Sequence, residues 1–314
     1  MPKLHNQLNK IYLSEKLEEI SRANGIDLLG FADASEFAGY ALERSIRRDP
    51  RLSLPGSQTI IVAGVYIGGA SLPAWSDPWH GRTSRLYLSG YFLDVTEPLM
   101  PMARFLRDYG YKAMICDGAG GASIIPLKLA AVRAGLGWQG KHSLLLTRKF
   151  GTFLALGGIL TDAILKHNRD KRPDRCGTCN KCREACPVSA LDQPYVLNRE
   201  RCLASLLMSD RLPGDVKHLI ENRVVDCEIC QDACPWNKRH LESPLQTKLT
   251  TSFLEKQKAW EDLFYLPALA EITEEEYQKR FVEPLKSDIS YKAFSRNVQS
   301  ALERAEKLKR LHTD

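Results

Sequence analysis

The chain of 314 residues is long enough for about two domains with a substantial buried core. Its 44% hydrophobic and 26% charged residues, without a low-complexity tract, exclude disordered and collagen-like proteins. Lysine and arginine (44) outnumber aspartate and glutamate (38), and the net charge of +6 does not by itself indicate a nucleic-acid partner. No segment reaches the roughly 18 apolar residues of a membrane span, and the N-terminus lacks a leader pattern. We expect a cytoplasmic, monomeric protein without membrane contact.

Hydrophobic periodicity in the first half of the chain predicts helices that alternate with strands. The segment 11–24 places Leu13, Leu17 and Ile20 at near-helical spacing, and the glycine at position 25 supplies a stop. Short apolar runs bounded by glycine, proline or serine are typical of buried strands. In chain order we then predict strands over 26–32 and 58–67, a helix over 95–109, a strand over 111–117, a helix over 124–134 and paired strands within 144–165.

The segment 71–92 has no clear period and is rich in proline, glycine, serine and aromatic residues, so we predict a long loop. Such a loop can line a pocket. It can also be a surface excursion that is packed by its own Trp75 and Trp79. Both interpretations remain open at this point.

The sequence GLGWQG over 135–140 satisfies the pattern G-x-G-x-x-G. Dinucleotide binding requires a strand before this pattern and a helix after it, whereas a predicted helix precedes it here. We therefore expect the glycines to permit close approach of another large cofactor or of packed backbone.

Eight of the nine cysteines fall between positions 176 and 234, and such crowding in a cytosolic protein favours metal ligation. The first four give C-x2-C-x2-C-x3-C-P, the spacing of two-cluster ferredoxins in which the fourth cysteine binds the other cluster. The second set repeats the C-x2-C-x3-C-P ending, with its first ligand displaced along the chain. We predict one [4Fe-4S] cluster on Cys176, Cys179, Cys182 and Cys234, and another on Cys202, Cys227, Cys230 and Cys186.

One alternative accompanies this prediction. A pair of four-cysteine zinc sites needs equally soft ligands, but it does not need the full ferredoxin spacing. The ninth cysteine, Cys116, ends an apolar strand, and we interpret it as a small buried hydrophobic residue.

Domain boundaries follow from the cysteines. We predict an α/β domain over 1–172, a ferredoxin-type domain over 173–240 with a helix between its cysteine groups, and a helical segment over 241–314. Helices are expected over 271–281 and 290–311. The last of these has Phe294, Val298, Ala301 and Leu302 on one face and a basic C-terminal end.

Three stretches together resemble the epoxyqueuosine reductase family and, more weakly, the cobalamin-dependent reductive dehalogenases. They are GLGWQGKHSLLLTRKFGTFLALGGILTDAIL, the CGTCNKCREACP run, and CEICQDACPWNK with Cys202 before it. The likeness covers about residues 125–240 well, and it extends to SRNVQSALERA near the C-terminus.

The resemblance implies an α/β (α+β) nitroreductase-like, cobalamin-binding domain joined to a small α-rich domain with two clusters. It implies cofactor-side roles for Trp138, Gln139, Lys141, His142 and Ser143, and positions near the corrin for Ser205 and Glu228. Trp138 alone is equally typical of a core residue, and Lys141 and His142 of a solvated turn.

Asp117 occupies the place of the family's proton donor, although GAGGASIIP lengthens the spacing to the glycine turn. The family's tyrosine- and histidine-bearing motif has no clean match in SRLYLSGYFLD. The chain also ends at Asp314, where the tRNA reductase commonly continues into helical repeats. These departures lie in substrate-facing parts of the family's pattern.

We expect a cobalamin-dependent iron–sulfur oxidoreductase that receives electrons from an external low-potential donor of the ferredoxin or flavodoxin type. No histidine lies in the setting that binds cobalt in corrinoid methyltransferases. The slightly favoured substrate is epoxyqueuosine in tRNA, with basic clusters at 44–48, 166–175 and 307–310 as candidate phosphate contacts. The alternatives are a paralogous reductase of a small molecule, an electron-transfer protein that reduces a corrinoid partner, and an iron–sulfur module without cobalamin.

Overall fold

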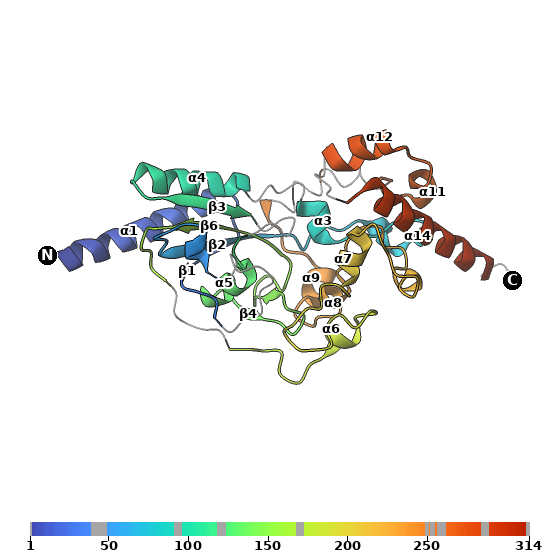
Figure 1. The fold of residues 1–314 in the computed structure, drawn as a ribbon, viewed down its shortest axis with the longest axis horizontal. Coiled ribbons are helices and arrows are strands. Elements are labelled where there is room, and N and C mark those ends of the chain that lie inside the picture. The colour runs from blue at the N-terminus through green and yellow to red at the C-terminus, as the bar shows by residue number, and fades with distance from the viewer. Residues whose placement is uncertain are drawn as a thin grey trace. The chain divides into compact units, whose positions relative to one another are not determined.

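Apolar runs between residues 28 and 161 form a four-stranded sheet in the computed structural model (Figure 1). The order across the sheet is β1-β2-β6-β3, and every neighbouring pair is antiparallel. The strands are β1 (Leu28–Asp33), β2 (Thr59–Tyr66), β3 (Ala113–Asp117) and β6 (Leu154–Thr161). The structure describes residues 2–38, 49–90, 96–117, 124–167, 173–248, 251, 255, 262–283 and 289–311.

The chain divides into two units, which are described separately. The first unit comprises Met1–Tyr66, Leu93–Gly140 and Leu144–Gly177, and the second comprises Ile67–Phe92, Lys141–Ser143 and Thr178–Asp314. Linear boundaries after positions 172 and 240 stay predictions.

Helices cover both faces of the sheet in the first unit, because its strands bury alternate residues on opposite sides. Ile61 and Ala63 of β2 pack in one core with helices α1 and α4. Ile60 and Val62 pack in another core with α5. These helices are α1 (Pro2–Ala23), α4 (Thr96–Asp108) and α5 (Leu127–Arg133), and a 3-10 turn spans Pro50–Leu52. The α+β form of the predicted fold class is therefore the one observed.

The two predicted strands within 144–165 exist, but they do not pair with each other. β5 (Leu145–Leu146) pairs with β4 (Trp138–Gln139). β6 lies instead at the centre of the large sheet, between β2 and β3. Strand length and polarity are local properties, whereas the choice of partner is not, and this explains the difference.

The second unit is mainly helical and contains all but the first of the clustered cysteines. The predicted loop over 71–92 is partly wrong, because it contains a 3-10 turn and a helix whose apolar residues join a buried core. The elements are η2 (Pro73–Ser76), α3 (Arg85–Gly90), α6 (Lys181–Glu184), α7 (Leu203–Met208), η3 (Lys217–Leu219), α8 (Ile229–Asp232), α9 (Lys238–Glu242), α11 (Leu266–Leu269), α12 (Glu274–Tyr277), the π-helix η4 (Gln278–Val282) and α14 (Tyr291–Leu311).

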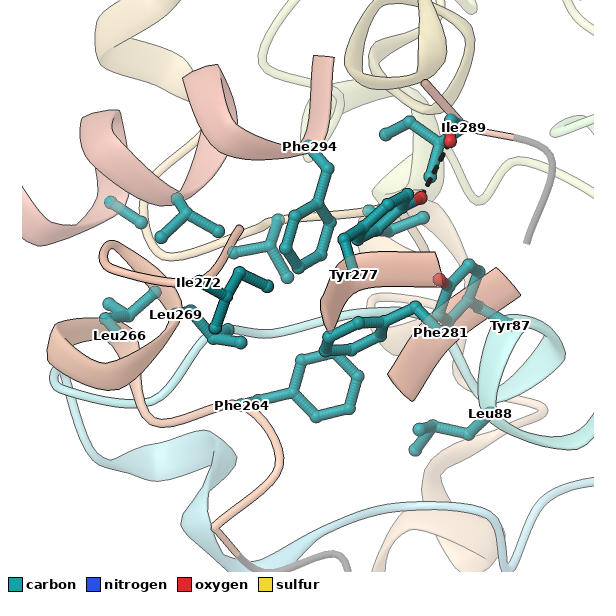
Figure 2. Packing of buried hydrophobic residues seen from close by; sticks show 14 of the residues in the cluster. Tyr87, Leu88, Phe264, Leu266, Leu269, Ile272, Tyr277, Phe281, Ile289 and Phe294 are labelled. Atoms are coloured by element: carbon teal, nitrogen blue, oxygen red, sulfur yellow. Dashed lines mark hydrogen bonds between the residues drawn. The ribbon is translucent and has the colours of Figure 1, made fainter. Parts of the chain in front are cut away.

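An aromatic cluster holds the C-terminal helices of this unit together (Figure 2). The rings of Phe281 and Phe294 each lie close to Tyr277, with centroids 5.6 and 4.8 Å away. The Tyr277 hydroxyl donates to the carbonyl of Ile289 at 2.7 Å, so its one polar atom is satisfied inside the core. The predicted apolar face of α14 is confirmed, since Phe294, Val298 and Ala301 are buried and Leu302 packs against them.

No helix among the described residues is long and apolar enough to cross a membrane.

Candidate functional site

The two cysteine groups fold into nearly identical local structures. In each group a cysteine precedes a one-turn helix, the second cysteine is the second helical residue, and the third follows the helix and precedes proline. The residues before the helices, Asn180 and Glu228, have φ/ψ angles of −127°/11° and −132°/21°. The residues that follow the two helices, Ala185 and Ala233, both have right-handed helical φ/ψ angles. The C-x2-C-x3-C-P spacing is thus a structural repeat built on α6 and α8.

The thiol at the end of the first group lies among those of the second group. Cys186 interacts electrostatically with Cys202, and Cys230 interacts with Cys227 and Cys202 and also with Cys182 and Cys186 of the first group. Cys186, Cys202 and Cys227 also pack against one apolar cluster that contains Leu203 and Leu207 of α7. This proximity supports the prediction that Cys186 joins the other three in one cluster.

Burial and mutual repulsion oppose ionisation of these thiols. Burial raises the pKa of Cys227 to about 12 and raises those of Cys202 and Cys230 as well. Backbone N–H groups act in the opposite direction: those of Ala204 and Ser205 point at Cys202 and lower its pKa. A bound cation would supply the missing positive charge, since metals deprotonate coordinating thiols outright.

The donor set fits iron–sulfur clusters. All eight clustered cysteines are free thiols, and soft thiolates are the ligands of four-iron clusters. Among the described residues, no three Cys, His, Asp or Glu side chains are arranged as ligands of a single metal ion. Thiols that bind a four-iron cluster lie farther apart than zinc ligands, because each binds a different iron atom. We call the cluster predicted on Cys176, Cys179, Cys182 and Cys234 the first cluster, and the one on Cys202, Cys227, Cys230 and Cys186 the second cluster.

Glu228, predicted to lie near the corrin, is paired with other residues of the protein in this structure. Its side chain is 2% exposed and forms ion pairs with Arg85 and Arg82. The Arg85 backbone N–H also donates to it at 2.9 Å. Burial raises the pKa of Glu228, and the Arg85 guanidinium opposes that effect. The sequence did not single out these two arginines, because they lie in the segment predicted as a loop.

The glycine turn has two structural explanations that do not involve a dinucleotide. Gly135 has a φ of 70° and ends α5, with its N–H bonded to the Val132 carbonyl and the next N–H bonded to Ala131. At Gly137, an added Cβ would lie 2.0 Å from the carbonyl oxygen of Leu146 in β5. The expectation of close backbone packing is confirmed at this position.

Trp138 and Gln139 form β4 in the first unit. Trp138 is 3% exposed, and it borders a cavity of about 400 Å³ together with Asp27 and Phe150. This volume is typical of a small-ligand pocket. Basic side chains line the same cavity, namely Arg148, Lys149 and Arg175.

The next three residues of the predicted cofactor motif belong to the second unit. The Lys141 ammonium donates to the carbonyl of Cys179 at 2.9 Å and to the Asn180 side chain at 3.3 Å. It therefore lies beside the first cysteine group and is not a solvated turn residue. His142 is buried, and Ser143 adopts a left-handed φ of 64°.

The remaining predicted residues are placed less fully. Asp117 is the last residue of β3, and its backbone lies opposite Gly157 of β6. Its side chain and the six residues after it lie outside the described part of the chain. Ser205 lies half-buried in α7, one turn after Cys202. Cys116 is 3% exposed in the core beneath α5, which confirms its interpretation as a buried hydrophobic residue. The basic cluster at 44–48 lies outside the described residues.

Comparisons with known proteins match the cysteine-rich region and also most of the chain. The model of the 4Fe-4S double cluster binding domain matches residues 175–237. An epoxyqueuosine reductase from Synechocystis sp. is 31% identical over 273 residues, which cover 82% of this chain and 87% of that protein. The double-cluster match confirms the prediction of two four-iron clusters over the zinc alternative.

Solved structures share the fold. Two structures of epoxyqueuosine reductase match with TM-scores of 0.76 at 23% identity, covering 95% of this chain and 83% of theirs. One, from Bacillus subtilis, has its catalytic aspartate loop swung out of the active site, and the other is bound to an epoxyqueuosine-modified tRNA-Tyr stem loop. A catabolic reductive dehalogenase matches more loosely, with a TM-score of 0.51 at 18% identity over 79% of this chain and 36% of that one.

Proposed function

The chain belongs to the epoxyqueuosine reductase family, and from this membership we propose that it reduces epoxyqueuosine in tRNA to queuosine, using two [4Fe-4S] clusters and cobalamin. The observation that carries the proposal is the double-cluster domain over 175–237 in a chain that matches a reductase along 82% of its length. The catabolic reductive dehalogenase, by contrast, is covered over only 36% of its own length.

The reaction sets what the protein must supply. Removing an epoxide oxygen as water, with formation of a carbon–carbon double bond, consumes two electrons and two protons. Four-iron clusters exchange electrons one at a time, so two clusters suit a two-electron reduction. When bound, cobalamin would supply a low-valent cobalt centre as the immediate reductant. The residues that would face it are the predicted motif residues Trp138, Gln139, Lys141, His142 and Ser143.

Asp117 is the residue that we propose as proton donor. It ends β3, and six residues rich in glycine follow it before Ile124. A carboxylic acid can protonate the leaving oxygen as a carbon–oxygen bond breaks. The catalytic aspartate loop of the Bacillus subtilis enzyme supports this assignment.

tRNA is the proposed partner, which the stem-loop complex of the related enzyme supports. Phosphate neutralisation requires exposed Lys and Arg side chains, and Lys307, Lys309 and Arg310 are exposed near the end of α14. The overall charge of +6 favours this contact.

The proposal is tested by anaerobic reconstitution with iron, sulfide and cobalamin, followed by incubation with epoxyqueuosine-containing tRNA and a chemical reductant. Mass spectrometry of the digested nucleosides should show conversion to queuosine. Asp117→Asn should slow conversion by a factor of about 100 or more, with unchanged iron and cobalamin content. Fully loaded protein that binds no tRNA and converts none of it would reject the proposal.

A further inference from the structure

A buried carboxylate lies between two predicted ligands of the second cluster. Glu228 directly follows Cys227 and lies two residues before Cys230, at the start of α8. With its side chain only 2% exposed, this carboxylate must be paired, because an isolated buried charge is strongly unfavourable. Its partners are therefore close to the polypeptide that holds the cluster.

The pairing involves four side chains, which we call the ion-pair network: Arg82, Arg85, Glu228 and Asp232. Arg85 contacts both carboxylates, Glu228 at short range and Asp232 at 3.1 Å. Arg82 likewise contacts Asp232 at short range and Glu228 at 3.5 Å. Two guanidinium groups thus neutralise two carboxylates on one turn of helix.

The backbone of the same segment is bonded to the chain that precedes the ligands. The Arg82 N–H donates to the Asn222 carbonyl at 2.7 Å, and the Arg82 carbonyl accepts from Val224 at 2.9 Å. Ser84 donates to the carboxylate of Asp226, whose other oxygen accepts from the backbone N–H of Cys227 at 2.7 Å. Segment 82–85 therefore contacts the chain on both sides of Cys227, at residues 222–226 before it and at Glu228 after it.

The guanidinium groups are themselves fixed. Both lie over the ring of buried Trp75, with Arg82 at 5.4 Å and Arg85 at 5.8 Å from its centroid. Arg85 is 8% exposed, so solvent screens its charge only weakly. A fixed positive charge at this depth acts on any charge that develops nearby.

We propose that the ion-pair network positions the ligands of the second cluster and sets its reduction potential. Reduction adds one negative charge to a cluster that already carries four thiolates, and nearby charge is one of the determinants of cluster potential. With Arg85 in place, the charge of Glu228 is balanced. Loss of Arg85 leaves Arg82 as the one cation of the network against two carboxylates, and this excess negative charge beside Cys227 disfavours addition of the electron and lowers the potential. The proposal needs the clusters but not the tRNA substrate.

Three variants separate charge from packing. Arg85→Gln removes one of the two positive charges and leaves the network with one excess negative charge, while Arg82 still contacts Glu228. Arg85→Gln combined with Glu228→Gln removes both charges and keeps two amides of similar size. Arg304→Gln is the matched control, because it removes an arginine of the same unit that pairs with Glu221 at 3.8 Å but is 40% exposed. Each protein is reconstituted anaerobically, assayed for iron, and titrated with reductant while cluster signals are followed by electron paramagnetic resonance.

We expect Arg85→Gln to lower the potential of one cluster and leave the other unchanged. The double variant should return that potential toward the wild-type value, and Arg304→Gln should change neither cluster. If Arg85→Gln instead loses about half its iron, and the double variant retains all of it, the positioning role is supported. Unchanged potentials in all three variants at full iron content would overturn the proposal. Equal loss of both clusters from the single and the double variant would overturn it as well.

Discussion

At the scale of single residues, the predicted division of the cysteines into eight cluster ligands and one core residue can be tested by substitution. Cys186→Ser should remove a ligand from the second cluster, although Cys186 belongs to the first sequence group, because its thiol lies near Cys202 and Cys230. We expect iron to fall from about eight toward about four per chain. Cys116→Ser, in the core beneath α5, should keep all of it. Iron and sulfide assays after anaerobic reconstitution decide the matter, and full iron in Cys186→Ser would contradict the crossed ligand set.

A second prediction at this scale concerns the glycine turn. Gly137→Ala places a Cβ about where the Leu146 carbonyl oxygen already lies, at 2.0 Å, so the backbone of β4 or β5 must shift. We expect a loss of about 2–3 kcal/mol in the free energy of unfolding, as for other overpacked positions. Gly214→Ala is the matched control, because nothing lies within 4 Å of its added Cβ. Thermal unfolding should show a lower Tm for Gly137→Ala alone, and equal values would refute this explanation.

At the scale of elements, sequence periodicity predicted what is local. The helix over 95–109 and the strand over 58–67 appear as α4 and β2, within one residue at each end. The antiparallel order β1-β2-β6-β3 was not predictable in this way, because it pairs strands that lie far apart in the sequence. The same limit hid Arg85, whose partner Glu228 is 143 residues away. The cysteines were predictable because their spacing alone specifies the chemistry.

Helix α14 also buries one amide among its apolar contacts. Asn297 is fully buried and donates to the carbonyls of Leu207, at the end of α7, and Val224, at 2.8 and 2.9 Å. Asn297→Ala removes both hydrogen bonds. The Leu207 carbonyl keeps a bond from Arg296 at 3.2 Å, whereas the Val224 carbonyl loses its side-chain donor, and we expect a cost of about 1–3 kcal/mol of stability. Gln299→Ala, on the exposed side of the same helix, should cost little. A Tm that falls equally in both variants would show that the buried amide has no special role.

Helix α9 carries a histidine that makes stability depend on pH. Burial, and then the positive charge of Arg239, lower the pKa of His240 from 6.5 to about 4. Arg239 also donates to His240 Nε2 at 3.3 Å, a bond that requires the neutral ring. Between pH 6.5 and 4 the unfolded chain binds a proton that the folded chain does not. Stability is therefore complete above pH 6.5 and falls as the pH drops, by up to about 3 kcal/mol.

The corresponding measurement is Tm at pH 7 and pH 5 for the wild type and two variants. His240→Gln should show a smaller decrease on acidification than the wild type does. His218→Gln, which replaces an exposed histidine of the same unit, should behave like the wild type. The difference between variants cancels any effect of acid on the clusters themselves. An unchanged pH dependence in His240→Gln would exclude this histidine as its source.

At the scale of the whole molecule, the chain passes several times between its two units. The predicted cofactor motif is divided by this path, with Trp138 and Gln139 in the first unit and Lys141, His142 and Ser143 in the second. In the linear sequence these residues fall within the short stretch 138–143, so the sequence alone does not indicate that the motif is divided between two units. The role of these five residues toward a cofactor stays a prediction, and Lys141 is distinguished from the others by its contact with the first cysteine group.

The substrate is a property of the whole molecule, and salt dependence tests it most directly. If tRNA binds through phosphate contacts, each contact releases counterions, and the logarithm of the binding constant falls linearly with the logarithm of salt concentration. The magnitude of this slope should decrease by roughly 0.7–0.9 for each contacting cation that is removed. Replacing Lys307, Lys309 and Arg310 together by glutamine should therefore flatten the slope if the end of α14 contacts tRNA, whereas Lys16→Gln, which removes a cation paired with Glu19, is the control. Binding of wild-type protein that weakens steeply with salt supports the RNA enzyme. Absence of binding even at low salt would instead favour a small-molecule reductase or a protein that reduces a corrinoid partner.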